Sequence, residues 1–212
     1  MNKKKYNKIV ILGQSQKFIK EIKKNYKYDS LSIIPWRQIR SYSYKKKEIY
    51  NLIFLAGFNF GIYTKGLTFF NQKNIYEPLK LIEKISNKKT LIIYINTQKM
   101  NDRNYTFSRY RYAKQKLGYL IYRKFKNSLI FDSDLIKVTN YISINSNVFS
   151  RFIFHIFSMF NLIKTIDIKK IFFEINNMII LKKRLKQRNI RGFLLNISRT
   201  QLIDRILRLI LG

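Results

Sequence analysis

Cysteine is absent from this chain of 212 residues, and proline, glycine and acidic side chains are all scarce. Without cysteine, neither a disulfide framework nor a thiolate metal site can form. Only 2 Pro and 7 Gly stand against 46% hydrophobic residues, a composition typical of a globular protein with a buried core rather than of a disordered basic arm. The sequence shows no repeat and no Pro-, Gly- or Ser-rich linker, so we expect a single domain.

The scarcity of acidic residues is the most informative feature of the composition. The chain has 11 Asp and Glu against 43 Lys and Arg, which gives a formal net charge of +32 at pH 7. A one-signed excess of this size costs a folded monomer self-repulsion, and a polyanion relieves it. AT-rich codon usage would raise the numbers of Lys and Asn, but it would supply Asp and Glu as well, so it does not explain why acidic residues are scarce. Because a polyanion would neutralise the excess charge, we expect a nucleic-acid partner.

The basic residues are spread along the whole chain. Stretches without any acidic residue cover 49–76, 103–131, 135–166 and 175–203. This distribution suits a surface in contact with many phosphates better than it suits an enzyme with one basic pocket.

Long apolar runs and targeting signals are also lacking. The apolar run at 152–163 is roughly half of the ~20 residues that a membrane helix needs, so we predict a core helix and no transmembrane segment. His155 lies in this run and is interpreted as a core residue without a chemical role.

Residues 1–8 form only a short basic segment that leads into the first predicted strand. We therefore expect no presequence, and translation either inside an organelle, in particular a mitochondrion, or in a bacterium with an AT-rich genome.

Short apolar runs alternate with helical patterns in the first 131 residues. The predicted strands are 8–12, 31–34, 52–56 and 91–95, and the predicted helices are 16–25, 76–86 and 108–124. Strands that alternate with helices in this way are typical of the α/β class, with a mostly parallel sheet and flanking helices.

After residue 131 the alternation loosens. Helices are expected at 148–162 and 198–211, and the pattern at 170–181 is mixed. Residues 132–212 are therefore predicted to form a reduced, mainly helical remainder that packs on the 1–131 core within one domain.

Several short motifs follow one another in a recognisable order. Residues 9–15 read IVILGQS, 51–57 read NLIFLAG, 91–97 form a run that ends in Thr97, 110–114 read YRYAK, 127–136 read NSLIFDSDLI, and 192–197 read GFLLNI. In this order the motifs resemble the extended short-chain dehydrogenase/reductase family, which includes NAD-dependent sugar epimerases and dehydratases. The resemblance covers most of the chain and implies a Rossmann-like fold. It also implies that Tyr110 and Lys114 occupy the positions of the family's catalytic Tyr-x-x-x-Lys pair.

The sequence departs from the family at the cofactor turn, which indicates a degenerate member. Gly13 is present, but the positions of the family's next two glycines fall on or beside Gln16 and Ile19, whose side chains would occupy the space of the pyrophosphate. Residues 35–37, Pro-Trp-Arg, replace the acidic residue that normally follows the second strand. We therefore predict that cofactor binding is lost.

The Tyr–Lys spacing is too frequent in this chain to identify an active site. It occurs at Tyr110/Lys114 and also at Tyr42/Lys46, Tyr76/Lys80, Tyr112/Lys116 and Tyr122/Lys126. A catalytic pair must share one helix face, which needs the spacing i, i+4, and every one of these pairs has that spacing. We therefore predict a pseudoenzyme with no catalytic residue, no cofactor and no metal site.

The predicted RNA-binding residues are clusters of Lys and Arg with few acids nearby. The densest is the segment 182–191, interpreted as a phosphate-binding segment, with a solvated helix face as the alternative. A second cluster, within 103–116, is interleaved with aromatic residues that could stack on unpaired bases. The complete set is Lys182, Lys183, Arg184, Lys186, Arg188, Arg191, Arg103, Arg109, Arg111, Lys45, Lys46, Lys47, Lys3, Lys4 and Lys5.

The charge, the eroded motifs and the expected lack of a presequence together favour a non-catalytic structural subunit of an organellar, in particular mitochondrial, ribosome. Its expected partners are ribosomal RNA and neighbouring ribosomal proteins, with no small-molecule substrate. Two alternatives stay open. One is an accessory scaffold subunit of a mitochondrial respiratory complex, and the other is an active NAD-dependent epimerase or reductase for sugar nucleotides.

Overall fold

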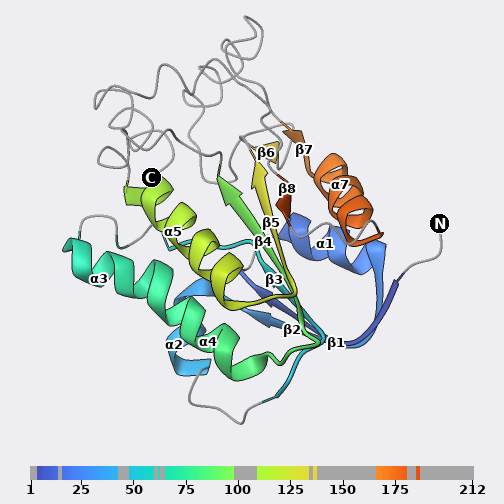
Figure 1. Ribbon diagram of the computed structural model, residues 1–212, viewed down its shortest axis with the longest axis horizontal. Helices are drawn as coiled ribbons and strands as arrows, with labels where there is room; N and C mark the ends of the chain where they lie inside the picture. Colours follow the sequence, from blue (N-terminus) through green and yellow to red (C-terminus); the bar gives the residue numbers. More distant parts are fainter. Residues whose placement is uncertain are drawn as a thin grey trace, which may run out of the picture.

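Segments of the first 133 residues supply five of the six strands of one parallel sheet (Figure 1). The computed structural model describes residues 4–13, 16–42, 48–59, 62, 65–97, 109–133, 136–137, 166–180 and 185–186. The strands of the sheet are β1 (Lys4–Leu12), β2 (Tyr26–Ile34), β3 (Leu52–Leu55), β4 (Leu91–Thr97), β5 (Ser128–Ser133) and the two-residue β8 (Leu185–Lys186). Their spatial order is β2-β1-β3-β4-β5-β8, and every neighbouring pair is parallel. A separate parallel pair joins β6 (Ile136–Lys137) to β7 (Ile166–Asp167).

Helices cover both faces of the sheet, as parallel strands require (Figure 1). One face carries α1 (Gln16–Asn25) and α7 (Ile168–Ile180). The other carries α2 (Ile39–Tyr42), α3 (Leu67–Asn71), α4 (Glu77–Ile85) and α5 (Arg109–Lys124). A π-helical turn at Gln72–Tyr76 connects α3 to α4 without a break, and a short 3-10 turn at Trp36–Gln38 follows β2.

The core has two halves, one on each face of the sheet. Alternate residues of a strand point to opposite faces, so in β1 Ile9 and Ile11 pack with α1 and α7, while Val10 and Leu12 pack with α2, α4 and α5. The central strand β3 is completely buried, because it has neighbours on both sides and helices on both faces. No helix among the described residues is long and apolar enough to cross a bilayer.

The sequence prediction of an α/β, Rossmann-like fold with a mostly parallel sheet is confirmed. The predicted helix at 16–25 coincides with α1, and the one at 108–124 differs from α5 by one residue. Two strands begin earlier than predicted, β1 at Lys4 and β2 at Tyr26. In the region 170–181, predicted as mixed, residues 170–180 belong to the helix α7, and residue 181 lies outside the described residues. The helices predicted at 148–162 and 198–211 lie outside the described residues.

Candidate active site

The strand order locates the candidate site at the carboxyl edge of the sheet. From β1 the chain crosses to β2 on one side and then returns to β3 on the other, so the connections leave β1 and β3 in opposite directions. Open parallel sheets bind ligands in the crevice beyond the carboxyl ends of the two strands where this reversal happens. Gly13 and Gly57 follow β1 and β3 at this point.

The two glycines allow the turns after β1 and β3 to touch. Gly13 has a φ of 130°, a conformation open mainly to glycine, and its N–H donates to the carbonyl of Ile34 at 2.9 Å. A Cβ at Gly13 would lie 3.0 Å from the backbone nitrogen of Gly57. A Cβ at Gly57 would lie 2.5 Å from Cε3 of Trp36. The space beside Gly57 is therefore occupied by the indole.

An amide network fixes the Trp36 ring in this position. Trp36 is 6% exposed, and its Nε1 donates to Oδ1 of Asn74 at 3.1 Å. The same oxygen accepts from the backbone N–H of Asn59 at 2.9 Å, and Nδ2 of Asn74 donates to the carbonyl of Asn59 at 3.3 Å. Asn74, in the π-helical turn, thus ties the segment after β3 to the segment after β2. Neither Asn59 nor Asn74 was singled out from the sequence, because the contacts join residues far apart in the chain.

A buried lysine lies at the carboxyl end of β4. Helix α5 positions Lys114 so that its Nζ donates to the carbonyl of Ile95 at 2.5 Å and lies 4.7 Å from the centroid of the Tyr94 ring. Lys114 is 6% exposed, and burial lowers its pKa to about 7. A lysine in this state exchanges protons close to neutral pH, as a general acid or base requires.

Close packing of α5 on β4 makes this burial possible. A Cβ at Gly118 would lie 3.2 Å from both Nδ2 of Asn96 and Cε1 of Tyr94. The hydroxyl of Tyr94 donates to the backbone carbonyl of Lys114 at 3.0 Å, which anchors the helix to the strand. Gly118 therefore lets the helix backbone approach β4 closely enough to enclose Lys114.

Tyr110 lies one helical turn before Lys114, on the same side of α5. Its half-buried ring packs edge-on against Phe58, with centroids 4.7 Å apart. Phe58 directly follows Gly57, so Tyr110 is held next to the turn after β3. The structure thus brings together, at one edge of the sheet, the glycine turns and the Tyr110/Lys114 pair.

The other Tyr–Lys pairs lack a buried lysine at this edge. Lys114 is the only lysine among the buried residues that the structure describes. Lys80 and Lys126 are exposed, Lys116 is partly exposed, and Lys46 lies outside the described residues. Of the five pairs with the same spacing in the sequence, the fold therefore selects Tyr110/Lys114.

The residues that replace the family's glycines and its acidic residue near the cofactor turn lie in different environments. Gln16 is exposed at the start of α1, whereas Ile19 is 5% exposed and packs in the core between α1 and the sheet. Arg37, which follows β2, is exposed. Among the residues that the structure describes, no group of three or more His, Asp and Glu could hold a metal ion.

The predicted RNA-binding residues do not form one surface in the described part of the chain. Lys4 and Lys5 are exposed at the start of β1, at the amino edge of the sheet. Arg109 begins α5, and its Nη1 donates to the carbonyl of Lys65 at 2.9 Å. Lys186 belongs to β8, and Arg111 to α5, but their side chains are not described. The remaining members, Lys3, Lys45, Lys46, Lys47, Arg103, Lys182, Lys183, Arg184, Arg188 and Arg191, lie outside the described residues.

Comparison with known proteins relates the chain to others by its fold. No protein-family model and no curated protein sequence matches it. Among solved structures it is similar to dTDP-4-dehydrorhamnose reductase from Bacillus anthracis in complex with NADP, with a TM-score of 0.57 and 11% identity, covering 97% of this chain and 82% of that chain. It is also similar to a dTDP-4-dehydrorhamnose reductase from Clostridium acetobutylicum, with a TM-score of 0.54 and 12% identity, covering 87% of this chain and 75% of that chain. The fold is therefore Rossmann-like and similar to the folds of these two reductases.

These similarities correct the function predicted from the sequence. Both matched proteins are reductases, and neither is a ribosomal or respiratory subunit. The predictions of a non-catalytic ribosomal subunit and of a pseudoenzyme are therefore wrong. The physical reason is that net charge attracts every anion, small nucleotides included, and does not distinguish a ribosome from them. The mitochondrial location stays a prediction.

Proposed function

We propose that this chain is a reductase of the extended short-chain dehydrogenase/reductase family that uses NADP and reduces a carbonyl group of a nucleotide-linked sugar. The observation that carries the proposal is the buried Lys114, with its lowered pKa, one turn after Tyr110 at the carboxyl edge of the sheet. A buried, proton-exchanging lysine next to a tyrosine is expensive to maintain in a protein that uses it only for packing.

The residues between β1 and β3, where the strand order reverses, fit a dinucleotide cofactor, although the turn after β1 is modified. Gly13 keeps the positive φ that lets the turn after β1 bend sharply, and α1 begins three residues later. The second and third glycines of the family are replaced, so we propose a member with a degenerate cofactor turn. Trp36 is part of this modification, because its indole occupies the space beside Gly57.

Arg37 favours the phosphorylated form of the cofactor. An acidic residue after the second strand binds the ribose hydroxyls of NAD, whereas an arginine there accommodates the 2′-phosphate of NADP. This chain has no acid at 35–37, and Arg37 is exposed directly after β2. The charge and position of Arg37 therefore support NADP over NAD.

Carbonyl reduction needs one hydride and one proton. A reduced nicotinamide, when bound, supplies the hydride. In this proposal Tyr110 donates its phenolic proton to the carbonyl oxygen of the substrate, and Lys114, one helical turn along on the same side of α5, returns a proton to the phenol. Because burial lowers the pKa of Lys114 to about 7, its side chain can hold or release that proton near neutral pH.

The substrate class rests on charge and on the matched reductases. A nucleotide-linked sugar carries a pyrophosphate, and a molecule with a net charge of +32 attracts anions of this kind. The two structurally similar proteins are named as reductases of a dTDP-linked sugar. Both observations support a sugar nucleotide rather than a neutral carbonyl compound.

Cofactor binding and turnover test the proposal. NADPH titrated into the protein should bind more tightly than NADH, and Arg37→Glu should remove that preference. Lys88→Glu, an equal charge change in the exposed turn after α4, should leave it intact. Lys114→Met should lower the rate of NADPH oxidation with dTDP-4-dehydrosugars by about 10²-fold or more, as expected for loss of acid–base assistance. A protein that binds neither NADPH nor NADH would refute the proposal.

A further inference from the structure

A basic cleft lies at the edge of the sheet opposite the candidate active site. Its volume is about 560 Å³, and the amino ends of β1, β3, β4 and β5 line it together with the last turn of α7. Strand connections place Gly13 and Gly57 at the carboxyl edge, so the two sites are separated by the length of the strands. The proposed reductase activity therefore does not use this cleft.

Four lysines line the cleft, and their charge is only partly compensated. Lys4, Lys5, Lys89 and Lys126 are all exposed. Lys5 pairs with Asp29 at 3.2 Å. No carboxylate of the described residues pairs with the other three lysines. Amide side chains complete the polar lining, contributed by Asn7, Asn51 and Asn127. Ammonium groups beside amides are a chemistry that suits phosphate oxygens.

Tyr6 also lines the cleft, and its ring packs in the core. It is 8% exposed, and its hydroxyl has no hydrogen-bond partner among the residues that the structure describes. Burial raises the pKa of Tyr6 to about 12, so the hydroxyl keeps its proton. Tyr6 therefore contributes an aromatic ring to the wall of the cleft rather than an accessible hydroxyl.

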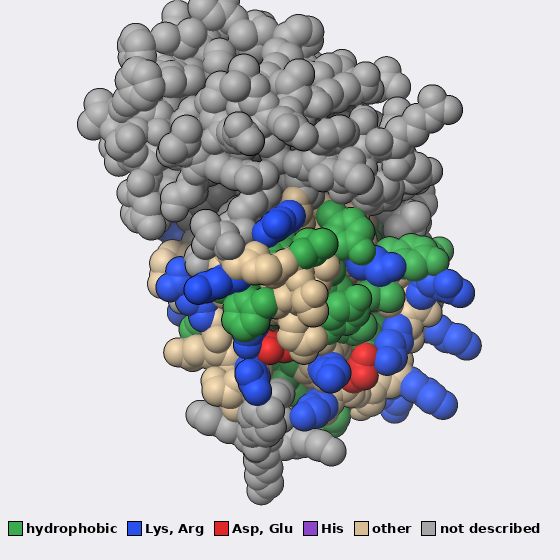
Figure 2. Space-filling model, turned by 90° about the vertical axis from the view of Figure 1, so that its left-hand side faces the viewer, with side chains coloured by type: hydrophobic (Ala, Val, Ile, Leu, Met, Phe, Trp, Pro, Cys, Tyr) green, Lys and Arg blue, Asp and Glu red, His purple; other side chains and the backbone are tan. Residues whose placement is uncertain are grey.

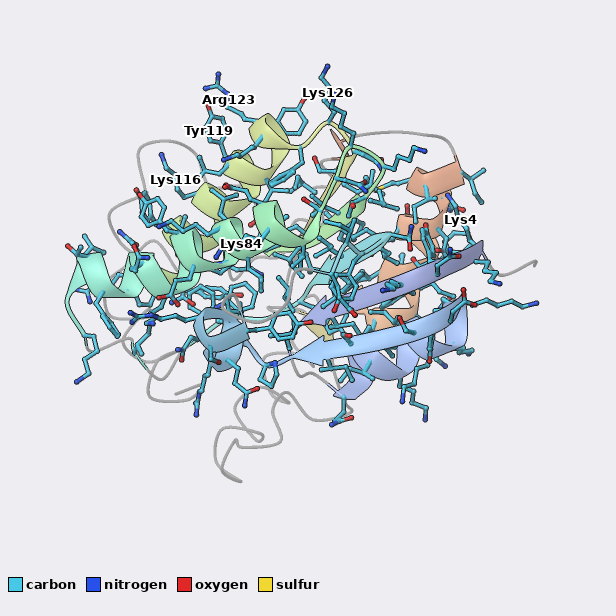
Figure 3. The ribbon with its side chains drawn as sticks, turned by 90° about the horizontal axis from the view of Figure 1, so that it is seen from below. Lys4, Lys84, Lys116, Tyr119, Arg123 and Lys126 are labelled. Atoms are coloured by element: carbon cyan, nitrogen blue, oxygen red, sulfur yellow. The ribbon has the colours of Figure 1, made fainter. Side chains whose placement is uncertain are left out.

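A row of basic and aromatic side chains continues from the cleft along α5. Lys116, Tyr119 and Arg123 follow the helical spacing i, i+3, i+7, and Figure 3 shows them on the same side as Lys126. Tyr119 is 52% exposed, and Arg123 lies 5.7 Å from its ring centroid and donates to its hydroxyl at 3.0 Å. Figure 2 shows Lys and Arg side chains spread over the described part of the face that carries α3, α4 and α5, with hydrophobic side chains between them and few acidic ones.

We propose that the cleft and this row on α5 bind a single-stranded nucleic acid. The lysines of the cleft take backbone phosphates, and the exposed ring of Tyr119, held by Arg123, stacks on a base. Non-specific single-strand binding combines a basic groove with such aromatic platforms. A free phosphate would fill the cleft alone and would leave the exposed Tyr119 and the cations around it without a role. Because the row on α5 extends beyond the cleft, a polymeric ligand is favoured over a free phosphate.

Fluorescence anisotropy of the full chain with a short labelled oligouridylate, at several salt concentrations, tests this inference. The double variant K4Q/K126Q should bind about tenfold more weakly, and the slope of log K against log salt should fall by about 1.4, or ~0.7 for each lost phosphate contact. Y119A should weaken binding about tenfold at an unchanged slope, because stacking does not release counterions.

The matched control is K20Q/K23Q, which removes the same charge from exposed positions of α1 on the other face of the sheet. It should change the affinity by less than about twofold. Equal losses in both double variants would overturn the site. Wild-type affinity in Y119A, with full competition by inorganic polyphosphate, would overturn a nucleic-acid ligand in favour of a free polyphosphate. NADPH binding should persist in K4Q/K126Q, which shows that the variant is folded and separates this test from that of the reductase.

Discussion

At the scale of single residues, the proposed activity rests on Lys114. Its ammonium group is buried, and it contacts the carbonyl of Ile95 and the face of the Tyr94 ring. Neither contact carries a full negative charge, so desolvation outweighs the attraction and the neutral amine is favoured. The same property that suits proton transfer makes Lys114 a cost to stability at low pH.

This cost predicts how stability depends on pH. The native pKa of Lys114 is about 7, whereas an unfolded lysine titrates near ~10.4. Between these values the unfolded state binds one more proton, so the free energy of unfolding should rise with pH by up to about 1.4 kcal/mol per unit. Urea unfolding between about pH 7.5 and pH 9.5 measures the rise, because above pH ~10 unfolded tyrosines also titrate.

The variant Lys114→Met should lose this pH-dependent rise. Lys116→Met, a change to the partly exposed lysine two residues along α5, serves as the control and should keep it. An identical pH profile for wild type and Lys114→Met would show that Lys114 is charged in the native state.

The contact between Gly57 and Trp36 gives a second prediction at this scale. In Gly57→Ala the new Cβ would lie 2.5 Å from the indole and 3.0 Å from Cα of Gly13, so the two turns must move apart. We expect a loss of about 1–3 kcal/mol in the free energy of unfolding, typical of overpacking. Gly66→Ala has nothing within 4 Å and should cost less than ~0.5 kcal/mol. Comparable urea midpoints for the two variants would contradict the close contact.

At the scale of elements, α7 completes the core on one face of the sheet. Its Phe172 stacks on Phe54 of the central strand with centroids 5.5 Å apart, and it also contacts Phe18 of α1. Phe172→Ala should therefore cost about 3–5 kcal/mol. The neighbouring Phe173 is 56% exposed, and Phe173→Ala should change the stability by less than ~0.5 kcal/mol. Equal effects of the two substitutions on thermal unfolding would mean that α7 does not pack on the sheet in this register.

How far the sequence predicts these elements depends on burial. The centres of β1, β3 and β4 are buried on both faces, so they appear as apolar runs that periodicity detects. Parallel pairing extends β1 and β2 back to Lys4 and Tyr26, where exposed polar residues give no apolar signal. Helix α7 looked mixed because Phe173 and Ile180 are apolar but exposed, which hides the helical spacing of its buried residues.

The site was less predictable than the fold. Five Tyr–Lys pairs are equivalent in the sequence, and only the approach of α5 to β4 at Gly118 makes one of them different. The order of motifs pointed to Tyr110 and Lys114, the pair used in the proposed reaction, although the sequence analysis predicted no catalytic residue. The bond from Trp36 to Asn74 spans 38 residues and has no local signal, so the filled space beside Gly57 could not be foreseen.

At the scale of the whole molecule, the charge of +32 supports both proposals without deciding between them. A positive field raises the local concentration of sugar nucleotides, of NADP and of nucleic acids alike. What separates the two proposed sites is position, because the Tyr110/Lys114 pair and the glycine turns lie at the carboxyl edge of the sheet, whereas the cleft with its lysines lies at the amino edge.

Self-repulsion of this charge should make the stability of the free protein depend on salt. Raising NaCl from about 10 mM to about 150 mM shortens the Debye length from ~30 Å to ~8 Å, which is less than the width of the domain. Salt screens the repulsion between distant lysines, whereas short ion pairs such as Lys73–Glu77, at 2.7 Å, lose less of their attraction. The melting temperature should therefore rise, by about 2–4 °C for each 1 kcal/mol of repulsion removed. K20Q/K23Q, with two fewer charges, should show a smaller rise in the same calorimetric scans. A melting temperature that falls with NaCl would mean that attractive pairs outweigh the repulsion, despite the excess of 43 basic over 11 acidic side chains.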